Sequence, residues 1–134
     1  MLAWVLHKND ATDYENSRLL EEAAEMGIEL RLVRPSDVDL LVTCKGRTSV
    51  RVAGAETPLP DVFLPRTGSG THYFALAVCR HIERLGLLTR NRPQAIEGAK
   101  TQPFSHPAAH ASNLPVPHTM LPTQPIHVHP VHQA

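Results

Sequence analysis

Charged side chains stop at Lys100. All 13 Lys and Arg residues and all 13 Asp and Glu residues of the 134-residue sequence lie at or before this position. Residues 101–134 instead hold seven of the 12 prolines and six of the nine histidines. Proline interrupts helices, and a segment so biased has few apolar anchors. We therefore expect one folded domain over residues 1–100 and a mostly irregular, uncharged, Pro- and His-rich tail over residues 101–134.

The overall composition excludes several classes of protein. The net charge is +0 and aromatic residues make up 4% of the chain, so the basic surface and stacking platforms of nucleic-acid-binding proteins are absent from the sequence. The longest internal apolar run, residues 74–79, is far shorter than the ~20 residues that span a bilayer. The two cysteines have no CxxC spacing, and the first residues do not resemble an export signal. We expect a soluble cytoplasmic protein that binds neither nucleic acid nor membranes.

Strand and helix patterns alternate within residues 1–100. The almost unbroken apolar run Leu2–Leu6 is typical of a strand that is covered on both faces, and further strands are predicted over residues 29–35 and 62–64. A helix pattern separates the first two strands, which favours a right-handed βαβ unit. The predicted fold class is α/β, with a small, partly parallel, Rossmann-like sheet flanked by helices.

The predicted helices have local start and stop signals. Thr12 and Glu15 have the spacing of a capping box, and Gly27 stops the helix that follows. A third helix is predicted to start with Asn91 as its N-cap. The second helix shows the clearest apolar face in the chain, made of Phe74, Ala75, Val78, Ile82 and Leu85.

A hairpin and two cysteines complete the local predictions. Residues 40–43 and 48–52 flank a short polar segment and are expected to pair as a hairpin. Cys79 falls on the apolar face of the second helix and is predicted to be a small core residue. Cys44 is expected to be a loop thiol without activation by a helix dipole. Neither cysteine is assigned a catalytic role.

One loop of the sequence has the composition of an anion-binding site. Arg66, Gly68, Ser69 and Gly70 lie between a predicted strand and the start of a helix. Backbone N–H groups and the helix dipole converge at such a point, and an Arg adds a fork of donors. The alternative is that the glycines only permit a tight turn and that Arg66 only reaches solvent. A lone Gly-x-Gly does not separate these interpretations.

Metal ligation and catalysis are weakly supported by the sequence. His127, His129 and His132 could bind a metal through imidazole nitrogens, but the tail has no Cys or carboxylate to complete a ligand set. We therefore favour adventitious binding over a dedicated metal site in the tail. The spacing of nucleophiles, histidines and carboxylates assembles no catalytic constellation, and no catalytic residue is predicted.

The sequence resembles the N-terminal region of RimK-type ATP-grasp ligases. In those proteins a strand that ends in Pro-Arg-x-Gly precedes a helix like the one predicted here, and a helix of the form N-x-x-x-A-I-x-x-A-(K/R) follows. The resemblance covers most of residues 1–120. The matching segments are residues 61–69, 74–78, 85–87, 91–100 and 114–117.

The resemblance implies a pre-ATP-grasp domain beside the active site of a ligase. Such enzymes use ATP and Mg²⁺ to activate a carboxylate and join it to an amine, usually adding glutamate to an amino acid or to a peptide or protein acceptor. It implies that Arg66, Gly68 and Ser69, with Gly70 in the same loop, bind substrate or phosphate. The loop composition and the resemblance thus point to the same residues, which favours an anion site over a simple turn. Lys100 is the remaining candidate for a nucleotide contact.

The chain also departs from the family pattern. Thr101 and Gln102 stand where the family has Asp-Lys, and Pro103 and Pro107 are expected to forbid the helix that follows. No acidic residue follows Glu97, so the family's Mg²⁺ ligands have no counterpart in this sequence. We expect a truncated ligase relative that is inactive by itself.

Two further expectations concern partners. The alternative function is a non-enzymatic module that binds a small anion or a protein and carries a His-rich tail. A pre-ATP-grasp domain without its catalytic partner exposes apolar surface near the strand ends, which makes a homo-oligomer an expected state.

Overall fold

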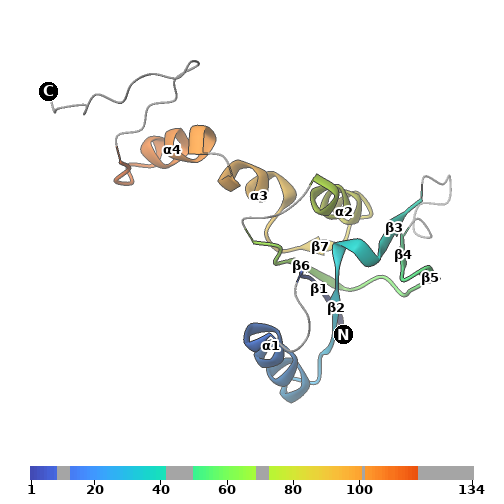
Figure 1. Cartoon of the computed structure of the whole chain (residues 1–134). Helices are drawn as coiled ribbons and strands as arrows, with labels where there is room; N and C mark the ends of the chain where they lie inside the picture. Colours follow the sequence, from blue (N-terminus) through green and yellow to red (C-terminus); the bar gives the residue numbers. More distant parts are fainter. Residues whose placement is uncertain (9–12, 42–49, 69–72, 101, 118–134) are drawn as a thin grey trace, which may run out of the picture. The chain divides into compact units, whose positions relative to one another are not determined.

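The structure is a computed structural model in which the chain divides into two compact units, Met1–Glu97 and Gly98–Ala134. Each unit is described by itself. The structure describes residues 1–8, 13–41, 50–68, 73–100 and 102–117 (Figure 1).

A four-stranded parallel sheet forms the centre of the first unit (Figure 1). Its strands are β1 (Leu2–Leu6), β2 (Glu29–Val33), β6 (Val62–Pro65) and β7 (Leu88–Thr89), in the order β2-β1-β6-β7. All three neighbouring pairs are parallel. The predicted α/β class is confirmed, and β7 is a strand that the sequence pattern did not reveal.

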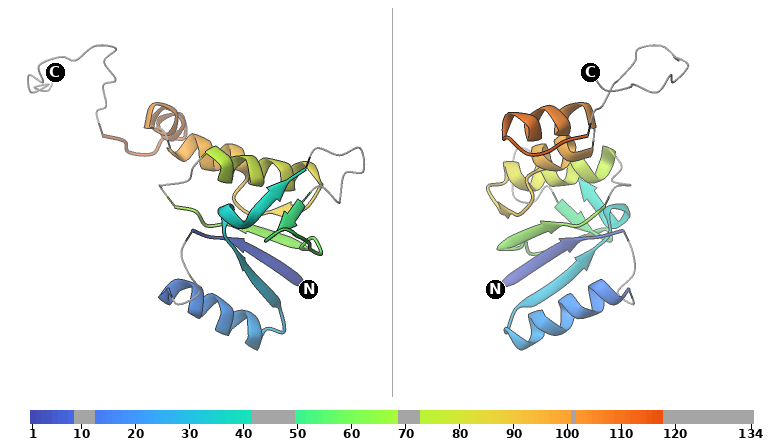
Figure 2. Two further views of the ribbon diagram at one scale, coloured as in Figure 1. Left: turned by 45° about the vertical axis from the view of Figure 1, so that its right-hand side comes forward. Right: turned by 90° about the vertical axis from the view of Figure 1, so that its left-hand side faces the viewer.

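Helices cover both faces of this sheet. Helix α1 (Tyr14–Glu25) lies on one face and α2 (Tyr73–Arg84) on the other (Figure 2). Strand β1 is therefore buried on both sides, as its unbroken apolar run predicts: Ala3, Trp4, Val5 and Leu6 are all buried. Because side chains alternate along a strand, Trp4 and Leu6 join the cluster on the α2 face while Ala3 and Val5 point to the opposite face.

A second, smaller sheet extends from the first. The 3₁₀ helix η1 (Pro35–Asp37) follows β2 and leads into β3 (Val38–Leu40). Strand β4 (Val50–Val52) pairs antiparallel with β3 and with β5 (Ala55–Glu56). The expected hairpin is confirmed in its paired strands, while its turn, residues 44–47, lies outside the described residues.

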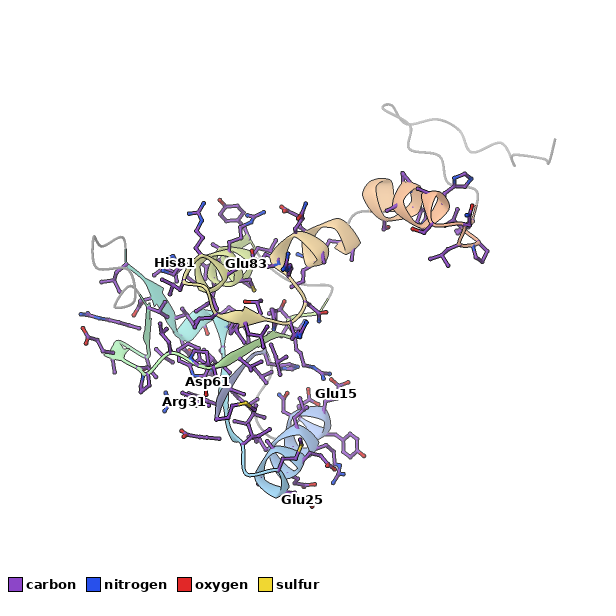
Figure 3. All side chains as sticks on the ribbon, turned by 180° about the vertical axis from the view of Figure 1, so that it is seen from behind. Glu15, Glu25, Arg31, Asp61, His81 and Glu83 are labelled. Atoms are coloured by element: carbon purple, nitrogen blue, oxygen red, sulfur yellow. The ribbon has the colours of Figure 1, made fainter. Side chains whose placement is uncertain are left out.

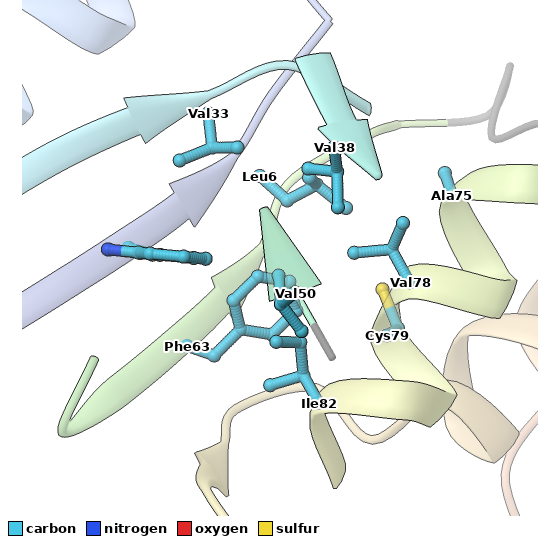
Figure 4. Packing of buried hydrophobic residues seen from close by; sticks show 10 residues of the cluster. Leu6, Val33, Val38, Val50, Phe63, Ala75, Val78, Cys79 and Ile82 are labelled. Carbon is cyan, nitrogen blue, oxygen red and sulfur yellow. The ribbon is translucent and has the colours of Figure 1, made fainter. Parts of the chain in front are cut away.

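The main core lies between the parallel sheet, the small sheet and α2. Cys79 is a buried member of it, as predicted. Phe74 is not: it is 45% exposed. At about 100° per residue, Phe74 lies a quarter-turn from Ala75, and the inward face of α2 is built on Ala75, Val78, Cys79 and Ile82 instead. The ten buried residues of the cluster (Figure 4) are Trp4, Leu6, Val33, Val38, Val50, Phe63, Ala75, Val78, Cys79 and Ile82.

The two ends of α1 differ in how well the sequence predicted them. The N-cap is Asp13, one residue after the expected Thr12, and Thr12 itself lies outside the described residues. At the other end Gly27 adopts φ 66°, and the amides of Gly27 and Ile28 donate to the carbonyls of Ala24 and Ala23 at 3.1 and 2.8 Å. These two bonds form a Schellman motif, so the predicted glycine stop is confirmed.

Two expectations about the C-terminal helices are wrong. Helix α3 (Pro93–Lys100) has Arg92, not Asn91, at its N-cap, since the Arg92 carbonyl accepts from the Ile96 amide and Asn91 is left-handed at φ 54°. Helix α4 spans Gln102–Ala111, although Pro103 and Pro107 were expected to prevent it. Pro103 is in the first turn, where an N–H has no helical acceptor, and Pro107 removes a single backbone bond from a short helix.

Among the described helices, none is both long and apolar enough to cross a membrane.

Burial of Cys79 makes a prediction about its reactivity. Desolvation raises the pKa of the Cys79 thiol to about 11, so the thiolate is scarce at pH 8 and no reagent has direct access. In a Cys44→Ser background, we expect a disulfide reagent to label Cys79 at least ~100-fold more slowly in the native protein than in denaturant. Mass spectrometry measures the labelling, and rapid labelling of the native protein would contradict the buried position of Cys79.

Candidate functional site

Three parallel strands end side by side at one edge of the sheet. In the strand register Leu6 is paired with Val33 on one side and with Pro65 on the other. The residues that follow these strand ends are His7, Arg34 and Arg66. They come from three distant parts of the sequence, yet each bears a basic side chain.

The strand order also reverses at this edge. The chain passes from β1 to β2 on one side of it, whereas β6 lies on the other side of β1. Helices α1 and α2 then cover opposite faces (Figure 2). In open α/β sheets, ligands bind at the carboxyl ends of the strands where the order reverses. The edge between the ends of β1 and β6 is therefore the candidate site, and Arg66 stands at it.

Backbone hydrogen bonds fix the positions of these residues. The His7 amide donates to the Val33 carbonyl at 2.9 Å, and the Arg66 amide donates to the Leu6 carbonyl at 2.8 Å. Arg66 is thus still tied to β1 after strand β6 has ended. Only its side chain is free to respond to a ligand.

The Arg66 side chain contacts Glu15. Its Nη2 lies 3.2 Å from Oε2 of Glu15, which stands in the first turn of α1, and the two side chains are 43% and 63% exposed. Figure 3 shows Glu15 and Glu25 at opposite ends of this helix. The expected capping box gave Glu15 a local role. In the structure its carboxylate instead joins α1 to the end of β6.

His7 and Asn16 form a buried pair beside this contact. They are 6% and 0% exposed, and Nδ2 of Asn16 lies 3.2 Å from Nδ1 of His7. In this arrangement the Asn16 amide nitrogen donates and Nδ1 of His7 accepts. Neither residue was predicted from the sequence to belong to a site. His7 could have been found from its position in the sequence, because it directly follows a buried strand and so lies at the candidate edge.

Arg34 is held within its own segment. Its Nε donates to Oδ2 of Asp37 at 2.9 Å, and this hydrogen bond lowers the pKa of the Asp37 carboxyl below its ordinary value. The pair is local, with a spacing of three residues. Arg34 therefore adds positive charge at this edge, and its side chain is paired with Asp37 of η1.

Two residues of the loop after Arg66, Thr67 and Gly68, are described. Thr67 is buried, and Gly68 adopts φ 66°, a left-handed conformation that side chains rarely tolerate. A Cβ at Gly68 would have no atom within 4 Å, so the constraint is backbone conformation alone. Ser69 and Gly70, the other predicted residues of this site, lie outside the described residues. Lys100 is the last residue of α3.

The residues present fit an oxyanion better than a metal ion. The guanidinium of Arg66 can hold a carboxylate or phosphate by two parallel hydrogen bonds. In the part of the chain that the structure describes, no three His, Cys, Asp or Glu side chains gather to hold a metal. His127, His129 and His132 lie outside the described range.

The fold and this edge define an open α/β domain with a candidate oxyanion site at the point where the strand order reverses. Residues 1–96 match the family described as the RimK PreATP-grasp domain. The chain belongs to this family.

Curated relatives carry ligase names. A probable alpha-L-glutamate ligase 1 of Shewanella amazonensis is 34% identical over 83 residues, which cover 62% of this chain and 27% of that protein. A probable alpha-L-glutamate ligase of Legionella pneumophila is 29% identical over 112 residues, which cover 84% of this chain and 37% of that protein. The matched segments thus span about a third of these relatives.

Solved structures share the fold. The ATP-grasp ligase PsnB, complexed with precursor peptide PsnA2 and AMPPNP, superposes with a TM-score of 0.63 at 19% identity, covering 87% of this chain and 45% of PsnB. The complex of PsnB with minimal precursor, Mg and ADP gives a TM-score of 0.59 at 18% identity, with the same shares covered. At this identity the likeness concerns the fold alone.

The buried pair at this edge makes a prediction about stability. In Asn16→Ala the ring of His7 loses its donor in a buried position, so we expect a loss of about 1–3 kcal/mol in the free energy of unfolding. Urea denaturation measures it. Glu21→Ala, on the exposed side of the same helix, should change stability by less than about 0.5 kcal/mol. Equal effects of the two variants would show that the pair does not hold α1 to β1.

Proposed function

We propose that residues 1–96 serve as the pre-ATP-grasp domain of an ATP-dependent carboxylate–amine ligase that adds glutamate. The family match and the glutamate-ligase names of the relatives support this function. The observation that carries it is the position of Arg66: a basic side chain at the carboxyl edge, where the strand order reverses. The acceptor is an amino acid or a peptide, as the precursor peptide bound to PsnB supports.

In this proposal the chain's own residues bind and orient a negative group. ATP, when bound, supplies the phosphoryl group that activates the carboxylate. Arg66 holds a carboxylate or phosphate oxygen pair through its guanidinium. Gly68, Ser69 and Gly70 let the backbone approach that anion at the start of α2, where the helix dipole favours negative charge. Lys100, which lies in the second unit, stays a candidate for a nucleotide contact of its own.

We propose further that residues 1–96 alone do not carry out ligation. They match the RimK PreATP-grasp domain. The matched segments cover 27% and 37% of the two glutamate-ligase relatives, which leaves most of each relative to supply the Mg²⁺ ligands. The domain then acts as the half of the active site that positions a substrate.

A second candidate function is protein binding at the same edge, without catalysis. Tyr14 and Tyr73 are the first residues of α1 and α2, and both are strongly exposed, as is Phe74 beside them. Exposed aromatic side chains are typical of surfaces that another protein covers. A second copy of this chain is one such partner, and sedimentation at high micromolar concentration would reveal it.

Adding the remaining part of a relative tests the proposed function. We would mix the full chain with the remainder of the Legionella relative and measure glutamate-dependent ADP release. We expect release only when both are present. Arg66→Ala should lower kcat/KM by about 10- to 100-fold, because a charge-assisted hydrogen bond of about 1.5–3 kcal/mol is lost.

Arg18→Ala is the matched control for this experiment. Arg18 is an exposed arginine paired with Glu21 and Glu22 on α1, away from the strand ends, and its loss should leave the rate unchanged. If Arg66→Ala and Arg18→Ala behave alike, Arg66 does not bind substrate. Release that is absent with the wild-type chain, together with a sedimenting dimer, would favour the protein-binding function.

A further inference from the structure

A negative charge from the chain itself occupies the candidate oxyanion site. The Arg66 guanidinium is the group that would bind a substrate oxyanion, and its Nη2 already lies 3.2 Å from a carboxylate oxygen of Glu15. The two residues are 51 positions apart. The contact therefore exists because the fold places the first turn of α1 next to the end of β6.

Both sides of this contact are tied to consecutive residues at the end of the central strand: Leu6, the last residue of β1, and His7, which follows it. The Arg66 amide donates to the Leu6 carbonyl at 2.8 Å. Asn16, the neighbour of Glu15, is fully buried and bonded to the His7 ring. Leu6 and His7 are consecutive, so β1 sets the separation of Arg66 and Glu15. This separates the contact from exposed ion pairs formed by two long side chains on mobile segments.

The ion pair is nevertheless weak enough to exchange. It consists of one contact at 3.2 Å between partly exposed side chains. A guanidinium has five N–H donors, and a substrate carboxylate or phosphate can engage two of them in parallel. An incoming oxyanion with that geometry makes the stronger interaction, and the Glu15 carboxylate then returns to water.

We propose that Glu15 is a positioning residue that competes with the substrate oxyanion for Arg66. The proposal rests on the proposed function, since it assumes that Arg66 binds substrate. While the site is empty, Glu15 holds the Arg66 side chain over the strand ends. A ligand has to displace Glu15, so the apparent dissociation constant equals the intrinsic one divided by the fraction of molecules in which the pair is open. Anions that engage Arg66 through one hydrogen bond are thereby disfavoured relative to bidentate ones.

The test is an NMR titration of the full chain with a defined anion. Amide resonances of Thr67 and Gly68 report binding beside Arg66, and inorganic phosphate and glutamate are added in separate experiments. We expect Glu15→Gln to tighten binding by roughly two- to five-fold relative to wild type, which is the range of an exposed ion pair. High salt should shrink the difference, because exposed charges are screened. The anion that responds identifies the source of the oxyanion.

Two variants show whether Glu15 acts through Arg66. Glu22→Gln removes an equally exposed carboxylate from the same helix, where it pairs with Arg18, and should leave anion affinity unchanged. In an Arg66→Ala background, Glu15→Gln should bring no gain. A general change in net charge would instead tighten binding in Glu22→Gln and in the double variant as well, which would overturn the proposal.

The outcomes also separate this inference from the proposed function. If Arg66→Ala abolishes anion binding but Glu15→Gln matches wild type, Glu15 does not compete and only the inference fails. If no variant binds phosphate or glutamate, the oxyanion site itself is wrong and both proposals fall. Weaker binding in Glu15→Gln than in wild type would assign Glu15 to the binding of substrate and would also overturn competition. Thermal unfolding of each variant confirms that the compared proteins are folded.

Discussion

Parallel pairing of β1 on both of its edges is the constraint on which the rest of this domain depends. Residues Leu2–Leu6 are apolar on both faces, so the strand is stable only at the centre of a sheet with a helix on each side. The register then aligns the ends of β2 and β6 with Leu6. As a consequence His7, Arg34 and Arg66, which are far apart in sequence, meet at one edge. The site is a product of the core, not of any single loop.

Features set by local spacing were predictable from the sequence, whereas contacts between distant segments were not. The buried strand at Leu2–Leu6, the stop at Gly27 and the core position of Cys79 each follow from neighbouring residues. Glu15 shows where such reasoning stops: its spacing from Thr12 indicates a capping box, and local spacing gives no sign of the contact with Arg66 that the tertiary fold creates. Phe74 fits a helical period, yet lies off the inward face of α2. The predicted effect of Pro107 was too large, because the loss of one backbone hydrogen bond does not abolish helix α4.

The basic residues of the carboxyl edge differ in what neutralises them. His7 is buried and hydrogen-bonded to Asn16. Arg34 is paired within its own turn with Asp37. Arg66 is paired with an exposed carboxylate from another element. A ligand that binds Arg66 therefore breaks no buried hydrogen bond and no local turn, which makes it the residue at this edge best able to exchange partners.

The half-neutralised edge bears on the proposal that this domain works beside another. With Glu15 in place, the proposed oxyanion site carries less net positive charge, so its affinity for a small anion in water is lower than that of an unpaired Arg66. A second domain that excludes water and adds cations would strengthen the interaction between Arg66 and a bound oxyanion, because electrostatic interactions strengthen as the local dielectric falls. The Glu15 pair, in contrast, offers a single contact and gains less than a bidentate ligand does. Closure of the two domains would then shift Arg66 from the chain's own carboxylate to the substrate's, which couples binding to assembly of the site.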